Sequence, residues 1–202
     1  MSGRPLTQWS NEELWQLFPV ELCEHKAGWH KAYTDEASAI RRRVGEQDVL
    51  RIRHIGSTAV PGLIAKPTVD ILLEIIDNAD LVQLKAAMEN LGYLYSPQPN
   101  NPAPHAMYLK GYTLLGYAGQ CFHVHVRYAG DWDELYFRDY LCAHPDVAGQ
   151  YGKLKTALQK KFHYDRDGYT AAKTEFVQRI TALARAEGDV QQIKRKGGGN
   201  HV

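Results

Sequence analysis

A loop of small residues followed by a lysine could hold an anion near the middle of the chain. Gly56, Ser57 and Thr58 come directly after residues 49–55, where polar and apolar side chains alternate as in a half-buried strand. Small residues let backbone N–H groups and hydroxyls approach an anion closely. Lys66 adds a positive charge further along the same loop. The pattern therefore favours an anion site in this loop.

An aspartate follows this loop at the start of a second predicted strand. The strand covers residues 68–76 and is apolar almost throughout, except for Asp70 and Glu74. A buried carboxylate is costly unless something pairs with it. From the residues alone two interpretations remain open. Asp70 either caps the loop by accepting its backbone N–H groups, or holds a metal ion beside a phosphate bound by the loop.

The motifs around this loop resemble the signature of a known family. The segment HIGSTAVPGLIAKPTVDILLEI (residues 54–75) is similar to that of the GrpB family, a branch of the nucleotidyltransferase superfamily. Shorter matches follow in the family's order: FHVHV (122–126), FRDYL (137–141), YGKLK (151–155) and YTAAKTEFV (169–177). The resemblance implies an α+β, nucleotidyltransferase-like fold, in which a mixed, largely antiparallel sheet of about five strands is packed by helices.

The same resemblance implies an activity and a set of site residues. The protein is expected to be a transferase that moves a nucleotidyl group from a nucleoside triphosphate to a small acceptor. Its expected cofactor is Mg²⁺ or Mn²⁺, bound at Asp70. Loop 56–58 would cradle the phosphates, and Lys66 would stabilise charge on the leaving pyrophosphate. Two lysines on predicted helices match the family pattern and are expected to bind the nucleotide: Lys155 and Lys173.

One position departs from the superfamily. Its second carboxylate stands two residues after the first, where this chain has Leu72. Glu74 is the next acid on that face, but at ~3.3 Å per residue it lies ~13 Å from Asp70, and ligands of one Mg²⁺ each stand ~2 Å from the ion. Glu74 cannot replace the missing ligand. Two alternatives therefore stay open: a non-catalytic nucleotide-binding module, or a ligase-type enzyme that activates a carboxylate.

Two histidines alternate with valines on a predicted strand over residues 120–128. His123 and His125 therefore face the same side, either as polar positions on an exposed sheet or as ligands. Histidines on the strand where the superfamily often keeps a third carboxylate imply a mixed metal site of Asp70, His123 and His125, or a phosphate site without metal. His125 is the candidate general base, because its unperturbed pKa lies near neutrality. A neighbouring strand lies only ~4.8 Å away, so one of these histidines should stand across from Asp70.

Composition limits the partners and the location. The 202 residues carry a formal net charge of +1, which argues against bulk binding to nucleic acid. The expected partners are a nucleotide and an unknown small acceptor. Three widely spaced cysteines, no long apolar run and no signal-peptide core predict a reduced, cytoplasmic protein without a membrane span.

The remaining patterns predict one domain over residues 1–187 and a disordered tail over 188–202. Capping boxes and apolar spacings predict helices at 11–18, 21–44, 81–91, 133–143, 145–164 and from about 168 to 187. Glycines predict turns between three successive antiparallel strands at 106–110, 112–117 and 120–128.

Overall fold

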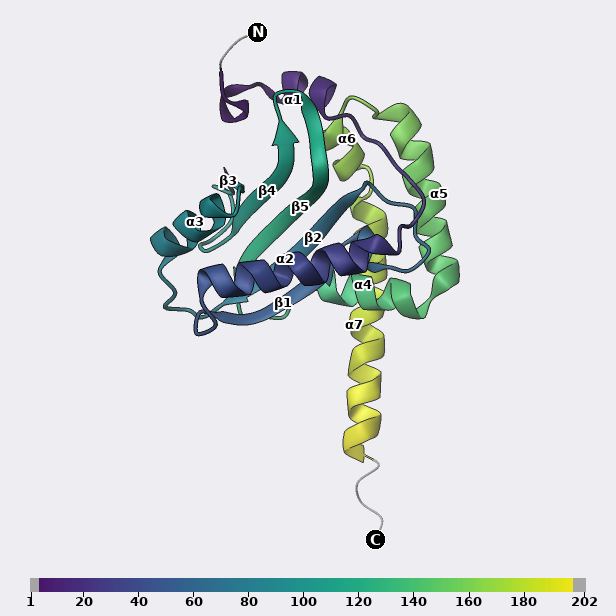
Figure 1. Cartoon of the computed structure of the whole chain (residues 1–202). Coiled ribbons are helices and arrows are strands. Elements are labelled where there is room, and N and C mark those ends of the chain that lie inside the picture. The colour runs from purple at the N-terminus through teal and green to yellow at the C-terminus, as the bar shows by residue number, and fades with distance from the viewer. Residues whose placement is uncertain (1–3, 198–202) are drawn as a thin grey trace.

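The computed structural model, which describes residues 4–197, contains one mixed sheet of five strands in the order β1-β2-β5-β4-β3 (Figure 1). The parallel pair is β2 with β5, and the other neighbours are antiparallel. The strands are β1 (Val49–Ile55), β2 (Thr68–Ile75), β3 (Leu94–Pro97), β4 (Ala106–Thr113) and β5 (Gly116–Tyr128). The predicted α+β class, with a largely antiparallel sheet of about five strands, is confirmed.

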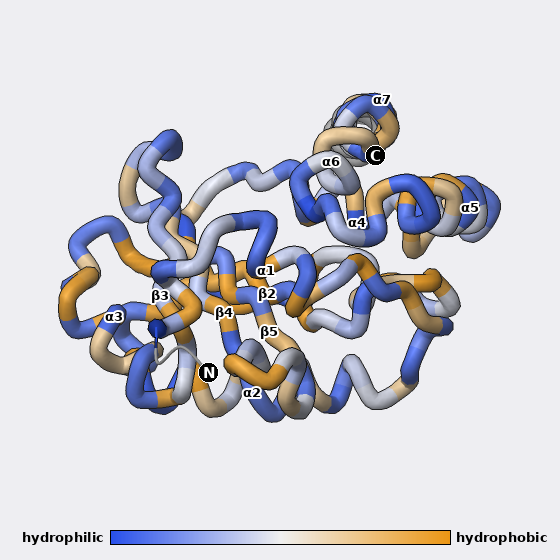
Figure 2. Tube along the Cα trace, turned by 90° about the horizontal axis from the view of Figure 1, so that it is seen from above, coloured by the Kyte–Doolittle hydropathy of each residue, from blue (hydrophilic) through white to orange (hydrophobic). Residues whose placement is uncertain are grey.

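Helices lie on both sides of this sheet. Figure 2 shows α2 and α3 on one side and α4 to α7 on the other. The helices are α1 (Asn11–Leu17), α2 (Gly28–Val44), α3 (Leu81–Asn90), α4 (Asp133–Ala143), α5 (Pro145–Lys161), α6 (Arg166–Ala171) and α7 (Thr174–Gly197), with short 3₁₀ turns at Leu6–Gln8 and Ser57–Ala59. The capping box predicted for α1 is present at Ser10 and Glu13.

Alternation along the central strands gives the sheet one apolar and one polar face. Successive residues of a strand point to opposite sides. The odd-numbered residues of β2 pack with α2 and α3 in the main core, together with the even-numbered residues of β5: Val69, Ile71, Leu73, Ile75, Phe122, Val124 and Val126. The polar and charged residues of both strands therefore face the side of α4 to α7: Asp70, Glu74, His123, His125 and Arg127.

Glu74 is a structural residue at the far end of β2. Its side chain is fully buried, and Oε1 accepts hydrogen bonds from Arg51 Nη2 at 2.6 Å and from the Gly130 N–H at 3.1 Å. These two contacts tie β1 and the turn after β5 to the middle of the sheet. These partners agree with the expectation that Glu74 does not bind the same metal ion as Asp70.

The predicted helix over 21–44 is wrong for its first part. The helix begins at Gly28, and Cys23 instead forms a short bridge with Ala65, their two N–H···O bonds being 2.9 and 3.0 Å long. A helix over 21–27 would leave the backbone of Ala65 without this partner. The extended segment therefore closes over the loop between β1 and β2.

The three predicted strands after residue 105 are in fact two. The turn lies at Leu114 and Leu115, between β4 and β5, rather than at Gly111 or Gly119. The pairing of β4 with β5 is instead irregular between Lys110 and Tyr112. Gly111 lies at this point, where an added Cβ would stand 2.9 Å from Cys121. Between the pairs Lys110–Phe122 and Tyr112–Tyr117, β4 has one intervening residue and β5 has four, so the register shifts by three residues.

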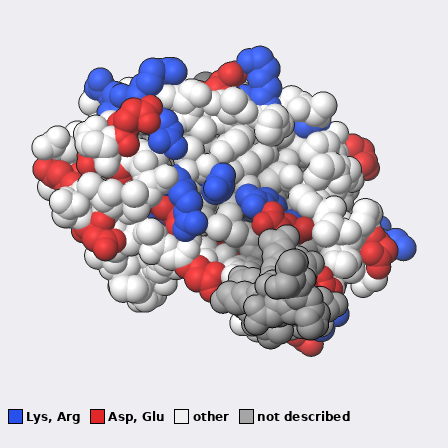
Figure 3. Space-filling model, turned by 90° about the horizontal axis from the view of Figure 1, so that it is seen from below, with Lys and Arg blue, Asp and Glu red and all other residues white. Residues whose placement is uncertain are grey.

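The chain end also differs from the prediction. Helix α7 continues to Gly197, so residues 188–197 are helical rather than a disordered tail, and residues 198–202 lie outside the described residues. None of the described helices is long and apolar enough to cross a membrane. On the face in Figure 3, basic and acidic side chains are interspersed.

Removal of the Glu74 side chain should destabilise the fold. In Glu74→Ala the Gly130 N–H loses its acceptor and Arg51 its buried partner, so we expect urea unfolding to show a loss of about 1–3 kcal/mol. The matched control is Glu46→Ala, whose carboxylate pairs with Arg41 but is 69% exposed. It should change stability by no more than about 0.5 kcal/mol. Equal losses in the two variants would contradict the structural role of Glu74.

Candidate functional site

The carboxylate of Asp70 meets two imidazoles from the neighbouring strand. The parallel register of β2 and β5 aligns Asp70 with His123, and His125 follows on the same face. Asp70 Oδ1 lies 3.4 Å from His123 Nδ1 and 3.3 Å from His125 Nε2. Burial favours the neutral carboxyl, but the hydrogen bonds and charges of both histidines outweigh it and hold the pKa of Asp70 well below its ordinary value. The carboxylate is thus ionised at neutral pH.

Gly56 lies directly against this carboxylate. Its φ is +70°, and a Cβ there would stand 2.6 Å from Asp70 Oδ2. Among the described residues, no backbone N–H donates to Asp70. Of the two interpretations left open by the sequence, the loop cap is therefore not the arrangement observed.

The turn after Gly56 is held by a chain of hydrogen bonds inside the protein. His54 Nε2 lies 3.0 Å from Thr58 Oγ1, which donates to the Thr68 carbonyl at 3.1 Å. The ring of His54 stacks on Tyr33, and burial lowers the pKa of His54 to about 4, so it is neutral. Thr58 is buried, and its hydroxyl is used in this chain. The sequence predicts that Thr58 contacts phosphate, but in the structure its hydroxyl donates to the Thr68 carbonyl.

A small polar cavity of about 220 Å³ lies beside Asp70. It is walled by the loop after β1, by β2 and β5, and by α5, α6 and the break before α7. Its lining residues are Gly56, Ser57, Lys66, Thr68, Asp70, His123, Tyr151, Lys155, Tyr169 and Lys173. Five of the six residues predicted to bind nucleotide are in this wall, together with Asp70 and His123. The structure places Thr58 elsewhere, and His125 touches Asp70 without lining the cavity.

Three lysines from distant parts of the chain converge on this cavity. Burial, together with the neighbouring cations, lowers the pKa of Lys66 and of Lys155 to about 7, and burial lowers that of Lys173 to about 8. Lys155 is only 2% exposed and donates to Ser57 Oγ at 2.9 Å and to the Ile64 carbonyl. The ordinary expectation for a lysine on a polar helix, exposure to solvent, is wrong for Lys155.

Two tyrosines that sequence reasoning missed complete the wall. Lys155 lies over the ring of Tyr151, with 4.7 Å from Nζ to the ring centroid, and Lys173 lies over Tyr169 at 4.3 Å. Tyr169 is 1% exposed, and its hydroxyl has no hydrogen-bond partner among the described residues. A signal for both was available, because each tyrosine precedes its lysine by four residues, the spacing at which side chains of a predicted helix share a face.

Tyr112 was missed for a different reason. Its hydroxyl lies 2.6 Å from His123 Nε2, and the two rings stack with 5.7 Å between centroids. By simple alternation along β4, Tyr112 would face the main core with Tyr108. The irregularity at Gly111 turns it to the opposite face, towards His123. No sequence pattern indicates this change.

The donor atoms at Asp70 suit some divalent cations better than others. Single ligand atoms of Asp70, His123 and His125 all lie within 4.8 Å of one another. Mg²⁺ prefers an octahedron of oxygens, whereas imidazole with carboxylate suits Mn²⁺, Fe²⁺ and Zn²⁺. Leu72, at the position of the second carboxylate, is fully buried, and supplies no oxygen. The residues present therefore fit Mg²⁺ poorly and Mn²⁺ better.

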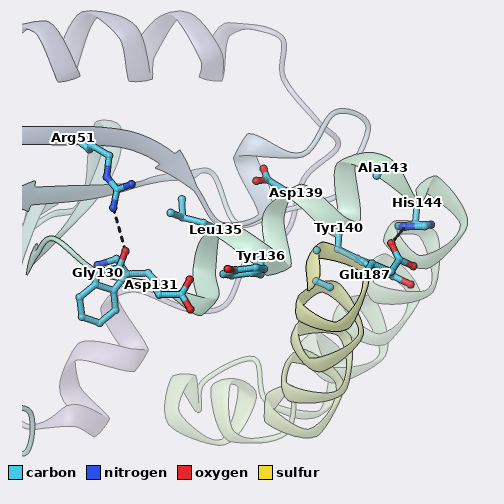
Figure 4. A pocket seen from close by; sticks show the side chains of 13 residues that line it. Arg51, Gly130, Asp131, Leu135, Tyr136, Asp139, Tyr140, Ala143, His144 and Glu187 are labelled. Atoms are coloured by element: carbon cyan, nitrogen blue, oxygen red, sulfur yellow. Dashed lines mark hydrogen bonds and ion pairs between the residues drawn. The ribbon is translucent and has the colours of Figure 1, made fainter. Parts of the chain in front are cut away.

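A larger cavity of about 460 Å³ lies at the other end of the sheet, between the turn after β5 and helices α4 and α7 (Figure 4). Its charged groups are engaged with each other or with backbone. Arg51 donates to the Gly130 carbonyl at 3.1 Å, and His144 lies 3.3 Å from Glu187. This larger cavity lacks the convergence of lysines seen in the cavity beside Asp70. The cavity beside Asp70 therefore remains the candidate site.

Comparison with known proteins gives one consistent family. The family model described as GrpB protein matches residues 19–183. A UPF0157 protein of Pseudomonas aeruginosa is 40% identical over 169 residues, covering 83% of this chain and 68% of that protein. The glutamate-rich protein GrpB of Alkalihalophilus pseudofirmus is 33% identical, covering 80% and 93%. The crystal structure of GrpB from Enterococcus faecalis superposes with a TM-score of 0.71 at 29% identity, covering 83% of this chain and 98% of that one.

Substitution of Gly56 should be more damaging than substitution of another glycine with the same backbone conformation. Gly56→Ala adds a Cβ against the Asp70 carboxylate and also strains a positive φ. Gly62→Ala has the same strain, with φ +73° and no atom within 4 Å of the added Cβ. Strain of this kind costs about 1–3 kcal/mol. We expect Gly56→Ala to lose at least ~1 kcal/mol more than Gly62→Ala in urea unfolding. Equal losses would mean that Asp70 moves aside freely.

Proposed function

The chain belongs to the GrpB family, within the nucleotidyltransferase-like superfamily, and from this premise we propose that the cavity beside Asp70 binds the phosphate groups of a nucleoside triphosphate. The observation that carries the proposal is the convergence of Lys66, Lys155 and Lys173 on one cavity with a single carboxylate. Lysines are rarely buried without a partner anion.

The charge of the cavity supports an anionic ligand. Among the described residues, Lys66 and Lys173 donate no hydrogen bond to a protein acceptor, and both ammonium groups lie over the ring of Tyr169, 5.8 and 4.3 Å from its centroid. Burial lowers the pKa of all three lysines, and neighbouring cations lower those of Lys66 and Lys155 further, so a bound anion would restore favourable interactions to the group. The unpartnered hydroxyl of Tyr169 offers one further donor.

The size of the cavity indicates which part of the ligand it holds. At about 220 Å³ it is smaller than pockets for drug-sized molecules, which span about 300–1,000 Å³. A chain of phosphates fits this space, while the sugar and base would lie outside it. The proposal therefore concerns polyphosphate recognition and leaves the base open.

Nucleotidyl transfer is the reaction that these residues would perform. An acceptor oxygen forms a bond to the α-phosphorus, the bond to pyrophosphate breaks, and the acceptor proton passes to a base. Lys66 and Lys173 would neutralise the leaving pyrophosphate, and His125 is the candidate base in the form without a metal ion on its ring nitrogen, because a metal-bound nitrogen cannot accept a proton. A divalent cation held by Asp70, His123 and His125 would supply further positive charge beside the phosphates.

A second candidate is a nucleotide-binding module without catalysis. It is favoured by one observation: Leu72 replaces the second carboxylate, and Asp70 is the only acid among the described residues that line the cavity. A ligase-type activation of a carboxylate would use the same pocket. Pyrophosphate release distinguishes an enzyme from a binding module. A nucleotidyltransferase and a ligase-type enzyme both release pyrophosphate with a suitable acceptor, and a binding module does not. A cytoplasmic location, where triphosphates are made, stays a prediction.

Loss of one lysine should weaken triphosphate binding specifically. We expect calorimetry with ATP, GTP, CTP and UTP to detect binding of at least one, and Lys173→Gln to weaken it at least ~10-fold, or about 1.4 kcal/mol. The matched control is Lys153→Gln, an exposed lysine on α5, which should bind like the wild type. An absence of heat with all four triphosphates and with pyrophosphate would refute the proposed function.

Triphosphate affinity should fall as pH rises from 7 to 9. The terminal phosphate ionises near pH 6, so the ligand charge is nearly constant over this range. Lys66 and Lys155 have a pKa of about 7, and Lys173 of about 8, so the cavity loses positive charge. Because these folded-state values lie below the unfolded value, the ligand-free fold gains stability over this window, while binding requires protons to be taken up.

Calorimetry at pH 8 in buffers of different ionisation enthalpy measures this proton uptake. Lys173→Gln should reduce it, and Lys153→Gln should leave it unchanged. Affinity that is constant or rises between pH 7 and 9 would show that the lysines are not deprotonated in the free protein.

A further inference from the structure

We propose that Asp70, His123 and His125 bind one transition-metal ion of the Zn²⁺ and Mn²⁺ class rather than Mg²⁺. The inference deepens the proposed function by naming the class of the ion at its site, and it can be tested separately because the protein ligands are complete without a nucleotide. It rests on the separation of the donor atoms, on the partner of the second nitrogen of His123, and on the open side of the cluster.

The separations are those of metal ligands rather than of strong hydrogen bonds. Charge-assisted N–H···O bonds are about 2.7–2.9 Å long. Here Asp70 Oδ1 stands 3.4 Å from His123 Nδ1 and 3.3 Å from His125 Nε2. Two ligands that each lie about 2.0–2.1 Å from a tetrahedral metal are about 3.3–3.4 Å apart. The two separations from Asp70 match this edge, and the ligand atoms of the two histidines lie within 4.8 Å of each other.

The surroundings of His123 also fit a ligand. Metal-binding histidines usually donate their other ring N–H to an oxygen, which sets the tautomer. The Tyr112 hydroxyl, 2.6 Å from His123 Nε2, can accept that proton and leave the Nδ1 lone pair facing Asp70. The irregular pairing beside Gly111, after which Tyr112 lies on this face, thus allows the Tyr112 hydroxyl to reach His123.

The cluster is accessible and has an open side. The side chains of Asp70, His123 and His125 are 28%, 13% and 23% exposed. Asp70 and His123 both line the cavity with the three lysines, so the remaining coordination positions would face it. Oxygen atoms of water or of a bound phosphate can occupy them, as at metal sites with three protein ligands.

The lysines beside the site predict that the affinity for the metal depends on a bound anion. One carboxylate stands against Lys66, Lys155 and Lys173, so a cation and these lysines repel one another across the cavity. A polyanion relieves both repulsions. Metal and polyphosphate should therefore strengthen each other's binding by the same factor, as linkage requires.

Metal titration of tag-free, chelator-treated protein tests the proposal. We expect calorimetry to show one site for Zn²⁺ and for Co²⁺, with Mn²⁺ weaker and Mg²⁺ at least ~100-fold weaker than Zn²⁺. Bound Co²⁺ should give visible absorption bands that report imidazole and carboxylate ligands. Wild-type protein that binds none of the transition ions, or that binds Mg²⁺ more tightly than Zn²⁺, overturns the proposal.

Variants place the ion. His125→Gln and Asp70→Asn should weaken Zn²⁺ and Co²⁺ at least ~10-fold, while His30→Gln, an exposed histidine on α2, should not. Thermal unfolding checks that each variant is folded. Where a ligand variant fails to fold, Tyr112→Phe keeps the stacked ring, and it should weaken Zn²⁺ by ~10-fold through loss of its hydroxyl. Full affinity in the folded variants places the ion elsewhere and overturns the assignment.

Two further measurements separate this inference from the proposed function. Metal titrations without nucleotide test the metal site alone, and triphosphate titrations with chelator present test the lysine cavity alone. Pyrophosphate should then increase the affinity for Zn²⁺, and Zn²⁺ should increase the affinity for pyrophosphate by the same factor. Metal binding that pyrophosphate leaves unchanged or weakens contradicts the assigned open side.

Discussion

The parallel pairing of β2 with β5 is the constraint on which the site depends. Because side chains alternate along both strands, the pairing that buries Ile71 and Val124 against α2 and α3 also places Asp70 beside His123 on the opposite face. A slip of one residue in this register would move the aspartate into the apolar core. The same hydrophobic pattern that forms the fold therefore holds the carboxylate and the imidazoles together.

The second wall of the site depends on a separate packing unit. Val60, Leu63, Leu141, Ala148, Tyr151 and Ile180 form a smaller apolar cluster that joins the loop after β1 to α4, α5 and α7. The ring of Tyr151 packs edge-on against Phe137 and stacks on Phe176, with centroids 5.2 Å away in each case. Burial of these rings offsets the cost of holding Lys155 away from water. Lys155 is thus held at the cavity wall by its hydrogen bonds to Ser57 Oγ and the Ile64 carbonyl.

The candidate site joins two opposite electrostatic environments within one small volume. Asp70 is kept ionised by its two imidazoles, while the lysines beside it are driven towards their neutral forms by burial and by each other. Perturbations of this kind concentrate at functional sites because ligands relieve them. An anion satisfies the lysines and a cation satisfies Asp70 with its histidines, so the arrangement suits a metal–polyphosphate ligand better than either ion alone.

The sequence by itself determined the two strands on either side of the Gly56 loop and the polar positions on one face of β2 and β5, because these depend on local alternation. The strands around Gly56 and Asp70, the shared face of His123 and His125, and the isolation of Glu74 all follow from a period of two residues. Tertiary structure alone decided that Lys155 is buried, that Thr58 bonds within its own loop and that Tyr112 reaches His123. A helical lysine has the same local pattern whether it faces water or a cavity, and a bulge changes the face of a side chain only through its pairing with the next strand. These outcomes depend on contacts between residues that are distant in the chain, which no local pattern records.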